Sequence, residues 1–95
     1  MIQSFADKVS RGFFLTGKPT KGCGWTDVQR VVARKLLALH AATSLDDLKA
    51  PPGNRLEALK GDRAGQHSIR VNDQWRVCFV WTAKGPEDVT VTDYH

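Results

Sequence analysis

The sequence lacks any apolar stretch long enough to cross a membrane or to form the core of a signal peptide, and the charged residues Asp7 and Lys8 stand near its start. It has only two cysteines, Cys23 and Cys78, which lie in unlike surroundings and far apart in the sequence. Two such cysteines suggest neither a disulfide framework nor a zinc site. These absences argue against a membrane protein or a disulfide-stabilised secreted domain, and they predict a protein of the reducing cytoplasm.

Several common signatures of catalysis and ligand binding are also missing. The sequence has no glycine-rich phosphate loop, no Ser-His-Asp order and no cluster of histidines and cysteines at the spacing of metal ligands. Asp93 and His95 carry side chains that bind metals, but a third ligand is not evident, so a metal site is disfavoured. Any chemistry must therefore come from dispersed side chains that the fold brings together.

What the sequence does contain is enough apolar material for one core. It has 95 residues, of which 41% are hydrophobic and 25% charged, and these include three Trp and four Phe. This composition predicts a single globular domain over residues 1–95 without a linker. The net charge is +4, and residues 49–76 carry six basic and three acidic side chains. We therefore expect a basic surface, which attracts polyanions.

The first half of the chain has helical spacing. A short helix is predicted over Asp7–Leu15, ended by Gly17 and Pro19, and residues 17–24 form a loop. Thr26 and Gln29 have the spacing of a capping box, and a longer helix is predicted from there to about Thr43. Its apolar positions are Val28, Val31, Val32, Leu36 and Leu39. A further helical turn is expected over residues 45–49, before Pro51 and Pro52.

The second half alternates with a period of two, which is typical of strands. Predicted strands are Arg55–Leu59, Gln66–Val71, Gln74–Trp81 and Asp88–Tyr94, and Ile2–Phe5 is a fifth candidate. Short turns at Asn72-Asp73 and Ala83–Glu87 require the later strands to run antiparallel. The sequence therefore predicts an α+β fold, with two N-terminal helices packed on one face of a mostly antiparallel sheet of four to five strands.

Strand alternation also assigns side chains to faces. Trp75, Val77, Phe79 and Trp81 share one side of the central strand, and we expect that side to meet the helices. The opposite face would then carry guanidinium and hydroxyl groups, which suit phosphates. These residues are Ser68, Arg70, Arg76, Thr90, Thr92 and Tyr94.

A set of side chains able to cleave RNA gathers around the end of the predicted sheet. Cleavage without a metal needs a base, an acid, cations for the charge on phosphorus and a platform for the nucleotide. His95 titrates nearest neutral pH, and Asp93, two residues earlier, lies on the same side of an extended chain, whereas Tyr94 points the opposite way. The candidate catalytic residues are Glu57, Lys60, His67, Arg76, Asp93, Tyr94 and His95, with Arg63 and Arg70 beside them.

Each of these residues also has a purely structural interpretation. The Asp93-Tyr94-His95 segment can be a frayed strand end, and Arg76 can be an ordinary solvated strand residue. His67 is either a histidine at the edge of the core or an active-site base. His40 is best read as a favourable charge at the end of the long helix. The basic residues Arg30, Arg34 and Lys35 are most simply the solvated side of that helix.

Taken together, several segments resemble the HigB branch of the RelE/ParE toxin superfamily. They are Met1–Phe5, Asp46–Asn54, Leu59–Gly65, His67–Val71, Gln74–Val77 and Asp93–His95. The resemblance spans nearly the whole chain. It implies a RelE-like fold and a ribosome-dependent endoribonuclease that cuts translated mRNA without a metal or a cofactor.

The resemblance also implies partners and residue roles. The implied partners are a HigA-like helix-turn-helix antitoxin, the ribosome and mRNA. The resemblance implies that toxin and antitoxin form a heterotetramer, in which only the antitoxin contacts operator DNA. Asp93, Tyr94 and His95 match the catalytic triplet, Lys60 the positioning lysine and Arg76 the strand arginine. Where some HigB toxins have a histidine three residues before that lysine, this chain has Glu57.

The leading hypothesis is therefore a bacterial, cytoplasmic mRNA interferase. We expect Arg34, Arg55, Arg63 and Arg70 to bind RNA. Two alternatives stay open: a non-enzymatic inhibitor of DNA gyrase, as ParE-like proteins are, and an RNA-binding module that does not cleave.

Overall fold

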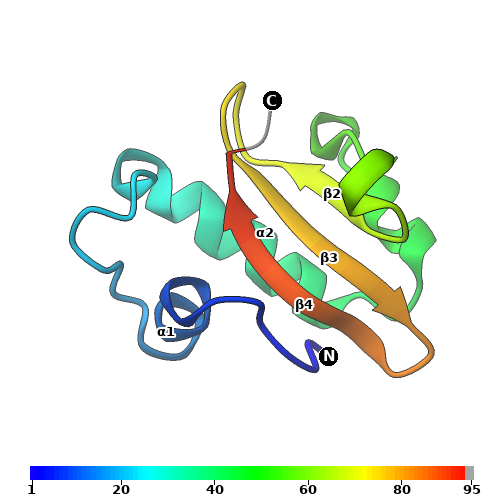
Figure 1. Cartoon of the computed structure of the whole chain (residues 1–95), viewed down its shortest axis with the longest axis horizontal. Coiled ribbons are helices and arrows are strands. Elements are labelled where there is room, and N and C mark those ends of the chain that lie inside the picture. The colour runs from blue at the N-terminus through cyan, green and yellow to red at the C-terminus, as the bar shows by residue number, and fades with distance from the viewer. Residues whose placement is uncertain (94–95) are drawn as a thin grey trace.

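The computed structural model describes residues 1–93, in which two α-helices are followed by a four-stranded sheet (Figure 1). The helices are α1 (Lys8–Thr16) and α2 (Gln29–Ala41). The strands are β1 (Glu57–Ala58), β2 (His67–Arg70), β3 (Arg76–Thr82) and β4 (Gly85–Thr92). Short 3-10 turns occur at η1 (Thr26–Val28), η2 (Leu45–Lys49), η3 (Pro52–Asn54) and η4 (Gly61–Arg63).

Helix α1 has clear start and stop signals. The Asp7 carboxylate accepts a hydrogen bond from the Ser10 backbone N–H at 3.0 Å, which satisfies one of the free donors of the first turn. Gly17 ends the helix with φ 76°, a left-handed conformation that glycine adopts without steric cost. The helix therefore lies within a residue of its predicted limits.

The start of α2 differs from the sequence-based expectation. Thr26 opens the 3-10 turn η1, and Val28, the residue before the helix, makes no side-chain capping bond. The predicted capping box at Thr26 and Gln29 is therefore wrong. Trp25, buried and packed edge-on against Phe13 with ring centroids 4.8 Å apart, anchors the entry to the helix instead.

The sheet is antiparallel throughout, in the order β1-β2-β3-β4, which confirms the α+β prediction. Within residues 1–93 a fifth strand is not formed, so that part of the prediction is wrong. Phe5 makes only an isolated parallel bridge with Val89, although backbone bonds tie the N-terminal segment to β4. The segment thus covers the outer edge of β4 without extending the ladder.

Strand β4 begins at Gly85, three residues earlier than predicted, and the preceding turn is correspondingly short. The register shifts between Cys78 and Val80, where Asp88 adopts φ 52°. This bulge lets the strand continue through Gly85 and Pro86, which the sequence pattern assigns to a turn.

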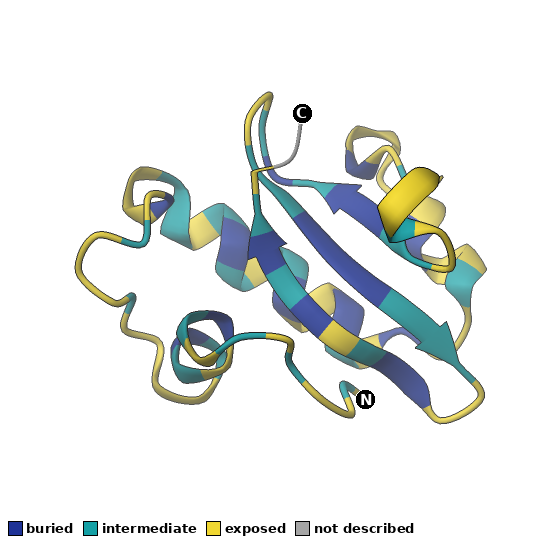
Figure 2. Cartoon of the chain, viewed as in Figure 1, coloured by how far each residue is buried: buried dark blue, intermediate teal, exposed yellow. Residues whose placement is uncertain are grey.

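The apolar side of the sheet forms the core, as the strand alternation predicts. Ile69, Val77 and Phe79 are fully buried in one cluster with residues of α2. Helix α2 contacts β3 and β4, and Figure 1 shows it behind the sheet, while α1 lies beside β4. Figure 2 shows the dark blue buried positions running along β3 and β4. The opposite face of β3, which we call the open face, carries the polar side chains, although Ser68 and Cys78 on this face are fully buried, contrary to the expectation for Ser68.

The N-terminal segment is held to α2 by His40. The His40 Nδ1 atom accepts a hydrogen bond from the Ile2 backbone N–H at 3.1 Å, and the ring packs against Phe14. His40, in the last turn of α2, therefore joins this helix to the N-terminal segment.

Ser10 links α1 to the sheet and gives a test of this arrangement. Its hydroxyl is fully buried and accepts the Val91 backbone N–H at 3.0 Å. Ser10→Ala leaves that N–H buried without an acceptor, so we expect a loss of about 1–3 kcal/mol in the free energy of unfolding. Urea denaturation measures this free energy.

Ser4→Ala is the matched control. The Ser4 hydroxyl accepts a hydrogen bond from the Asp88 backbone N–H at an exposed position, so we expect its loss to change the free energy of unfolding by less than about 0.5 kcal/mol. Equal effects of the two substitutions would contradict this role of Ser10.

Candidate active site

The strand register places the predicted site residues in two rows across the open face. Arg70, Arg76 and Thr92 lie opposite one another on β2, β3 and β4. Glu57, Ser68, Cys78 and Thr90 form the neighbouring row. Because residues directly opposite in an antiparallel pair point to the same side, both rows share one face. The sheet thus brings together residues that are far apart in the sequence.

Arg76 and Glu57 form the central charge pair of this face. The Arg76 Nη1 atom lies 3.7 Å from Glu57 Oε1, and their side chains are 22% and 51% exposed. That separation is an ion pair but is too long for a hydrogen bond. Within residues 1–93, Nη1 is buried and has no hydrogen-bond partner. The Arg76 side chain is 22% exposed overall, so a phosphate can reach part of it, but contact with Nη1 itself requires neighbouring groups to move.

Cys78 lies beneath these charges and is fully buried. Burial raises the pKa of its thiol to about 11, whereas the nearby Arg63 and Arg76 guanidiniums act in the opposite direction and Glu57 raises it further. The thiol therefore stays protonated at neutral pH, where it is neither a nucleophile nor a metal ligand. Arg63, which contributes to this effect, comes from the turn η4.

The turn η4 supplies the remaining cations from in front of the sheet, on the side away from α2 (Figure 1). Arg63 is half-buried and donates from Nη1 to Gln66 Oε1 at 3.2 Å. Lys60 immediately precedes η4 and is exposed. Both residues therefore come from a turn rather than from a strand.

The end of β4 brings Asp93 beside the β2–β3 hairpin. Gln74 Nε2 donates a hydrogen bond to Asp93 Oδ2 at 3.0 Å. Asp93 directly follows Thr92, the residue opposite Arg76. The other two members of the predicted triplet, Tyr94 and His95, lie outside the described residues.

His67 lies apart from these residues. It is opposite Ala58 on β1 and Phe79 on β3, on the face that carries the apolar core. Its ring stacks on Phe79 with centroids 6.2 Å apart, and in the described part of the chain its Nδ1 atom is buried without a hydrogen-bond partner. This position favours the core-edge interpretation of His67 over the active-site one.

A second cationic group lies near the far edge of β2. Lys35 donates a hydrogen bond to the side chain of the buried Asn54. The pKa of Lys35 is lowered mainly by burial and, to a smaller extent, by the positive charges of Arg34 and Arg70. Arg70 also pairs with the exposed Asp73. Arg55 is exposed, with φ 45°. Arg70 itself lies on the open face, opposite Arg76, so this cationic group adjoins that face at the end of β2.

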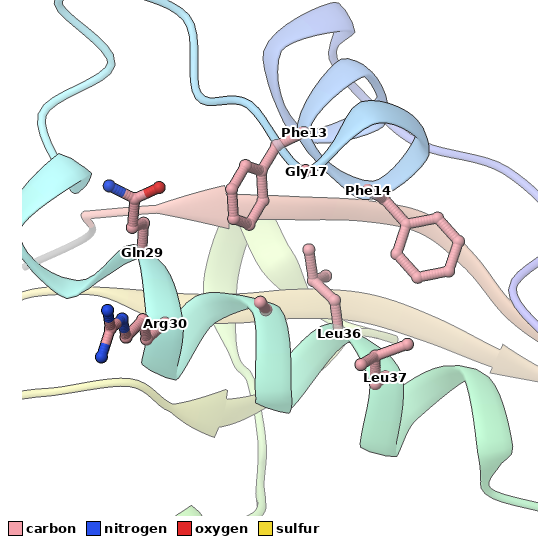
Figure 3. Close-up of a pocket in the computed structure, with 8 residues that line it drawn as sticks. Phe13, Phe14, Gly17, Gln29, Arg30, Leu36 and Leu37 are labelled. Carbon is pink, nitrogen blue, oxygen red and sulfur yellow. The ribbon is translucent and has the colours of Figure 1, made fainter.

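A cavity between the two helices belongs to neither group. Figure 3 shows it between α1 and α2, where Phe13 and Phe14 face Leu36 and Leu37. Its volume is about 300 Å³ and its lining is mainly apolar. This cleft is formed by the helices and does not include the charged residues of the open face.

Two kinds of site are not found in the described residues. Residues 1–93 contain no group of three or more His, Cys, Asp or Glu side chains that could hold a metal ion. No helix in this part of the chain is long and apolar enough to span a membrane.

Some residues of the site were not singled out by the sequence. Gln74 reads there as the first position of a strand, and Cys78 as an apolar strand residue. The alternation of β2 does predict the position of His67, because it puts His67 on the same side of the strand as Ile69, which is part of the core. No sequence signal pairs Gln74 with Asp93.

These features define a small α+β protein with a cationic open face that holds one carboxylate beside its central arginine. The chain belongs to the HigB-like toxin family, described as the RelE-like toxin of type II toxin-antitoxin system HigB, whose family model matches residues 3–95.

Individual relatives agree with this assignment. The chain is 36% identical to an endoribonuclease HigB from Proteus vulgaris over the full length of both proteins. It is 46% identical over 56 residues to toxin HigB-1 of Vibrio cholerae and 39% identical over 54 residues to an uncharacterized protein of Haemophilus influenzae. These two matches cover 59% and 57% of this chain, and 59% and 54% of those relatives.

The buried thiol gives a test of the open face. At pH 8, which is below the pKa of about 11, Cys78 should resist iodoacetamide, whereas the half-exposed Cys23 should react. Mass spectrometry of tryptic peptides measures labelling at each cysteine. Unfolding in guanidinium should make both cysteines reactive, which serves as the control. Labelling of native Cys78 as fast as Cys23 would contradict the burial described here.

Proposed function

We propose that this chain is the toxin of a type II toxin-antitoxin system and acts as a ribosome-dependent, metal-independent endoribonuclease on translated mRNA. The observation that carries the proposal is the open-face cluster, in which Arg76, Arg63 and Glu57 gather near the point where Asp93 leaves β4. The Proteus relative named an endoribonuclease matches the chain from end to end and so supports the same activity.

The reaction requires no group beyond those of the chain and its substrate. The 2′-oxygen of the RNA attacks the adjacent phosphorus, a new O–P bond forms, and the bond to the 5′-oxygen breaks. His95 and Asp93 move the protons, taking one from the 2′-hydroxyl and supplying one to the leaving oxygen. Tyr94 stacks on or hydrogen-bonds the nucleotide. Arg76 and Lys60 stabilise the charge that builds on phosphorus.

Arg76 suits this role for a structural reason. A strand residue flanked by the buried Val77 has its backbone fixed by the core, so its guanidinium is pre-positioned. The side chain is also 22% exposed, which leaves part of it open to a phosphate. An electrostatic group that is already oriented costs little reorganisation during the reaction.

Membership of a toxin-antitoxin family supports a proposal for the partners and the cellular setting. We propose a single toxin domain over residues 1–95, bound by a HigA-like helix-turn-helix antitoxin in a heterotetramer that contacts operator DNA only through the antitoxin. The ribosome and mRNA are the other partners, in the bacterial cytoplasm. Arg34, Arg55, Arg63 and Arg70 contact RNA, so binding should weaken as salt rises.

Purified protein and programmed ribosomes test the activity. The parent protein should cut ribosome-bound mRNA, and Arg76→Ala and His95→Gln should each slow cleavage by about 100-fold or more, since each removes a group that acts on the reacting phosphate. Primer extension locates and quantifies the cuts. Arg30→Ala, at the distant cleft between α1 and α2, is the control and should cleave at the parental rate. Intact mRNA with the parent protein, or inhibition of gyrase supercoiling in its place, would refute the proposal.

Glu57 requires a separate test, because a carboxylate at this position repels RNA while it orients Arg76. An exposed pair of this kind contributes about 1 kcal/mol at most, so Glu57→Gln should lower kcat by no more than about five-fold. It should also strengthen RNA binding, because it removes a negative charge from the open face. Single-turnover cleavage gives the rate and filter binding gives the Kd.

Glu87→Gln is the matched control for Glu57→Gln. Glu87 lies opposite Val80, near the other end of β3. We expect a smaller change in Kd and no change in kcat. A loss of kcat by 100-fold or more in Glu57→Gln would instead make Glu57 a proton-transfer group.

A further inference from the structure

The hairpin that joins β2 to β3 is held by its own side chains. The Asn72 Oδ1 atom accepts the backbone N–H groups of Gln74 at 2.9 Å and of Trp75 at 2.6 Å. Trp75 in turn accepts the N–H groups of Val71 and Asn72 through its carbonyl oxygen. With the ion pair between Arg70 and Asp73 added, the turn has few free torsions left.

The same hairpin is fixed to the body of the protein through Trp75. Its indole lies against Gly24 so closely that a Cβ atom at Gly24 would come within 2.8 Å of the ring. Gly24 also has φ 94°, a conformation that other residues rarely adopt. The hairpin therefore presents Gln74 from a rigid support on the loop that precedes α2.

Gln74 uses this support to hold Asp93. The last ladder pair between β3 and β4 is Arg76 with Thr92, so Asp93 lies one position beyond the regular ladder. The bond of 3.0 Å from Gln74 Nε2 to Asp93 Oδ2 extends the attachment of β4 past that pair. Terminal residues beyond a ladder otherwise fray.

We propose that Gln74 is a positioning residue of the ribonuclease site, which orients the Asp93 carboxylate. This inference rests on the function proposed above. A neutral amide suits the task because it holds the carboxylate without cancelling its charge. A carboxylate that keeps its negative charge can serve in acid–base catalysis.

Kinetics on programmed ribosomes test this role. Gln74→Ala should lower kcat about ten-fold and leave KM within about two-fold, because it loosens a catalytic carboxylate without removing a contact to RNA. The melting temperature should not change, since the Asn72 side chain holds the backbone N–H of residue 74 and not its side chain. Gln74→Glu, which sets two carboxylates against each other, should lose more activity than Gln74→Ala.

Gln3→Ala is the matched control. The Gln3 amide also makes side-chain hydrogen bonds, to Met1 and Lys84, but it lies near the opposite end of β3. We expect parental kcat and KM for this variant. A loss equal to that of Gln74→Ala would show a general effect on folding and would overturn the inference.

A double-mutant cycle with Asp93→Ala separates positioning from direct RNA contact. If Gln74 acts through Asp93, the double variant should cleave at the rate of Asp93→Ala alone. Additive losses, or a rise in KM at constant kcat for Gln74→Ala, would mean that Gln74 contacts RNA itself, and the inference would be wrong. Parental cleavage by Gln74→Ala while Arg76→Ala is inactive would overturn this inference alone. Intact mRNA with the parent protein would instead remove the proposed function.

Discussion

The arrangement of the open face depends on the burial of the other side of β3. Val77 and Phe79 are fully buried against the helices, so the alternation of the strand forces Arg76 and Cys78 to the opposite face. A slip of one residue would put the Arg76 guanidinium into the apolar core and expose Phe79, at a cost of several kcal/mol. Hydrophobic burial, rather than any polar contact, therefore fixes the position of the central arginine.

The positive charges of this protein form two groups, which differ in how far nearby carboxylates neutralise them. On the open face, Arg76 pairs with the Glu57 carboxylate, and both act together with Arg63 on the buried Cys78 thiol. At the edge of β2, Lys35 lies near Arg34 and Arg70, and this crowding, together with burial, lowers the pKa of Lys35. Two cationic groups on one small domain suit a long polyanion, because each neutralised phosphate adds to the affinity.

Local patterns in the sequence predict much of this structure. Period-two alternation places Arg76 on the open face, and the helical spacing gives α2 to within a few residues of its limits. The bulge in β4, the single bridge of Phe5 and the uncapped start of α2 depend on tertiary contacts, which local patterns do not carry. The hydrogen bond from Gln74 to Asp93 has the same origin, because it joins residues 19 positions apart in the sequence.

The Glu57–Arg76 pair bears on how a carboxylate is tolerated beside an RNA-binding arginine. At 3.7 Å the pair is held by charge and does not consume an Arg76 Nη1 donor. Glu57 is half-exposed, so water and salt screen its repulsion of RNA, whereas the more buried Arg76 keeps most of its attraction. A phosphate can therefore approach the exposed part of the Arg76 side chain while Glu57 stays in place. The carboxylate holds the guanidinium by charge, on a face that the substrate reaches from the solvent side.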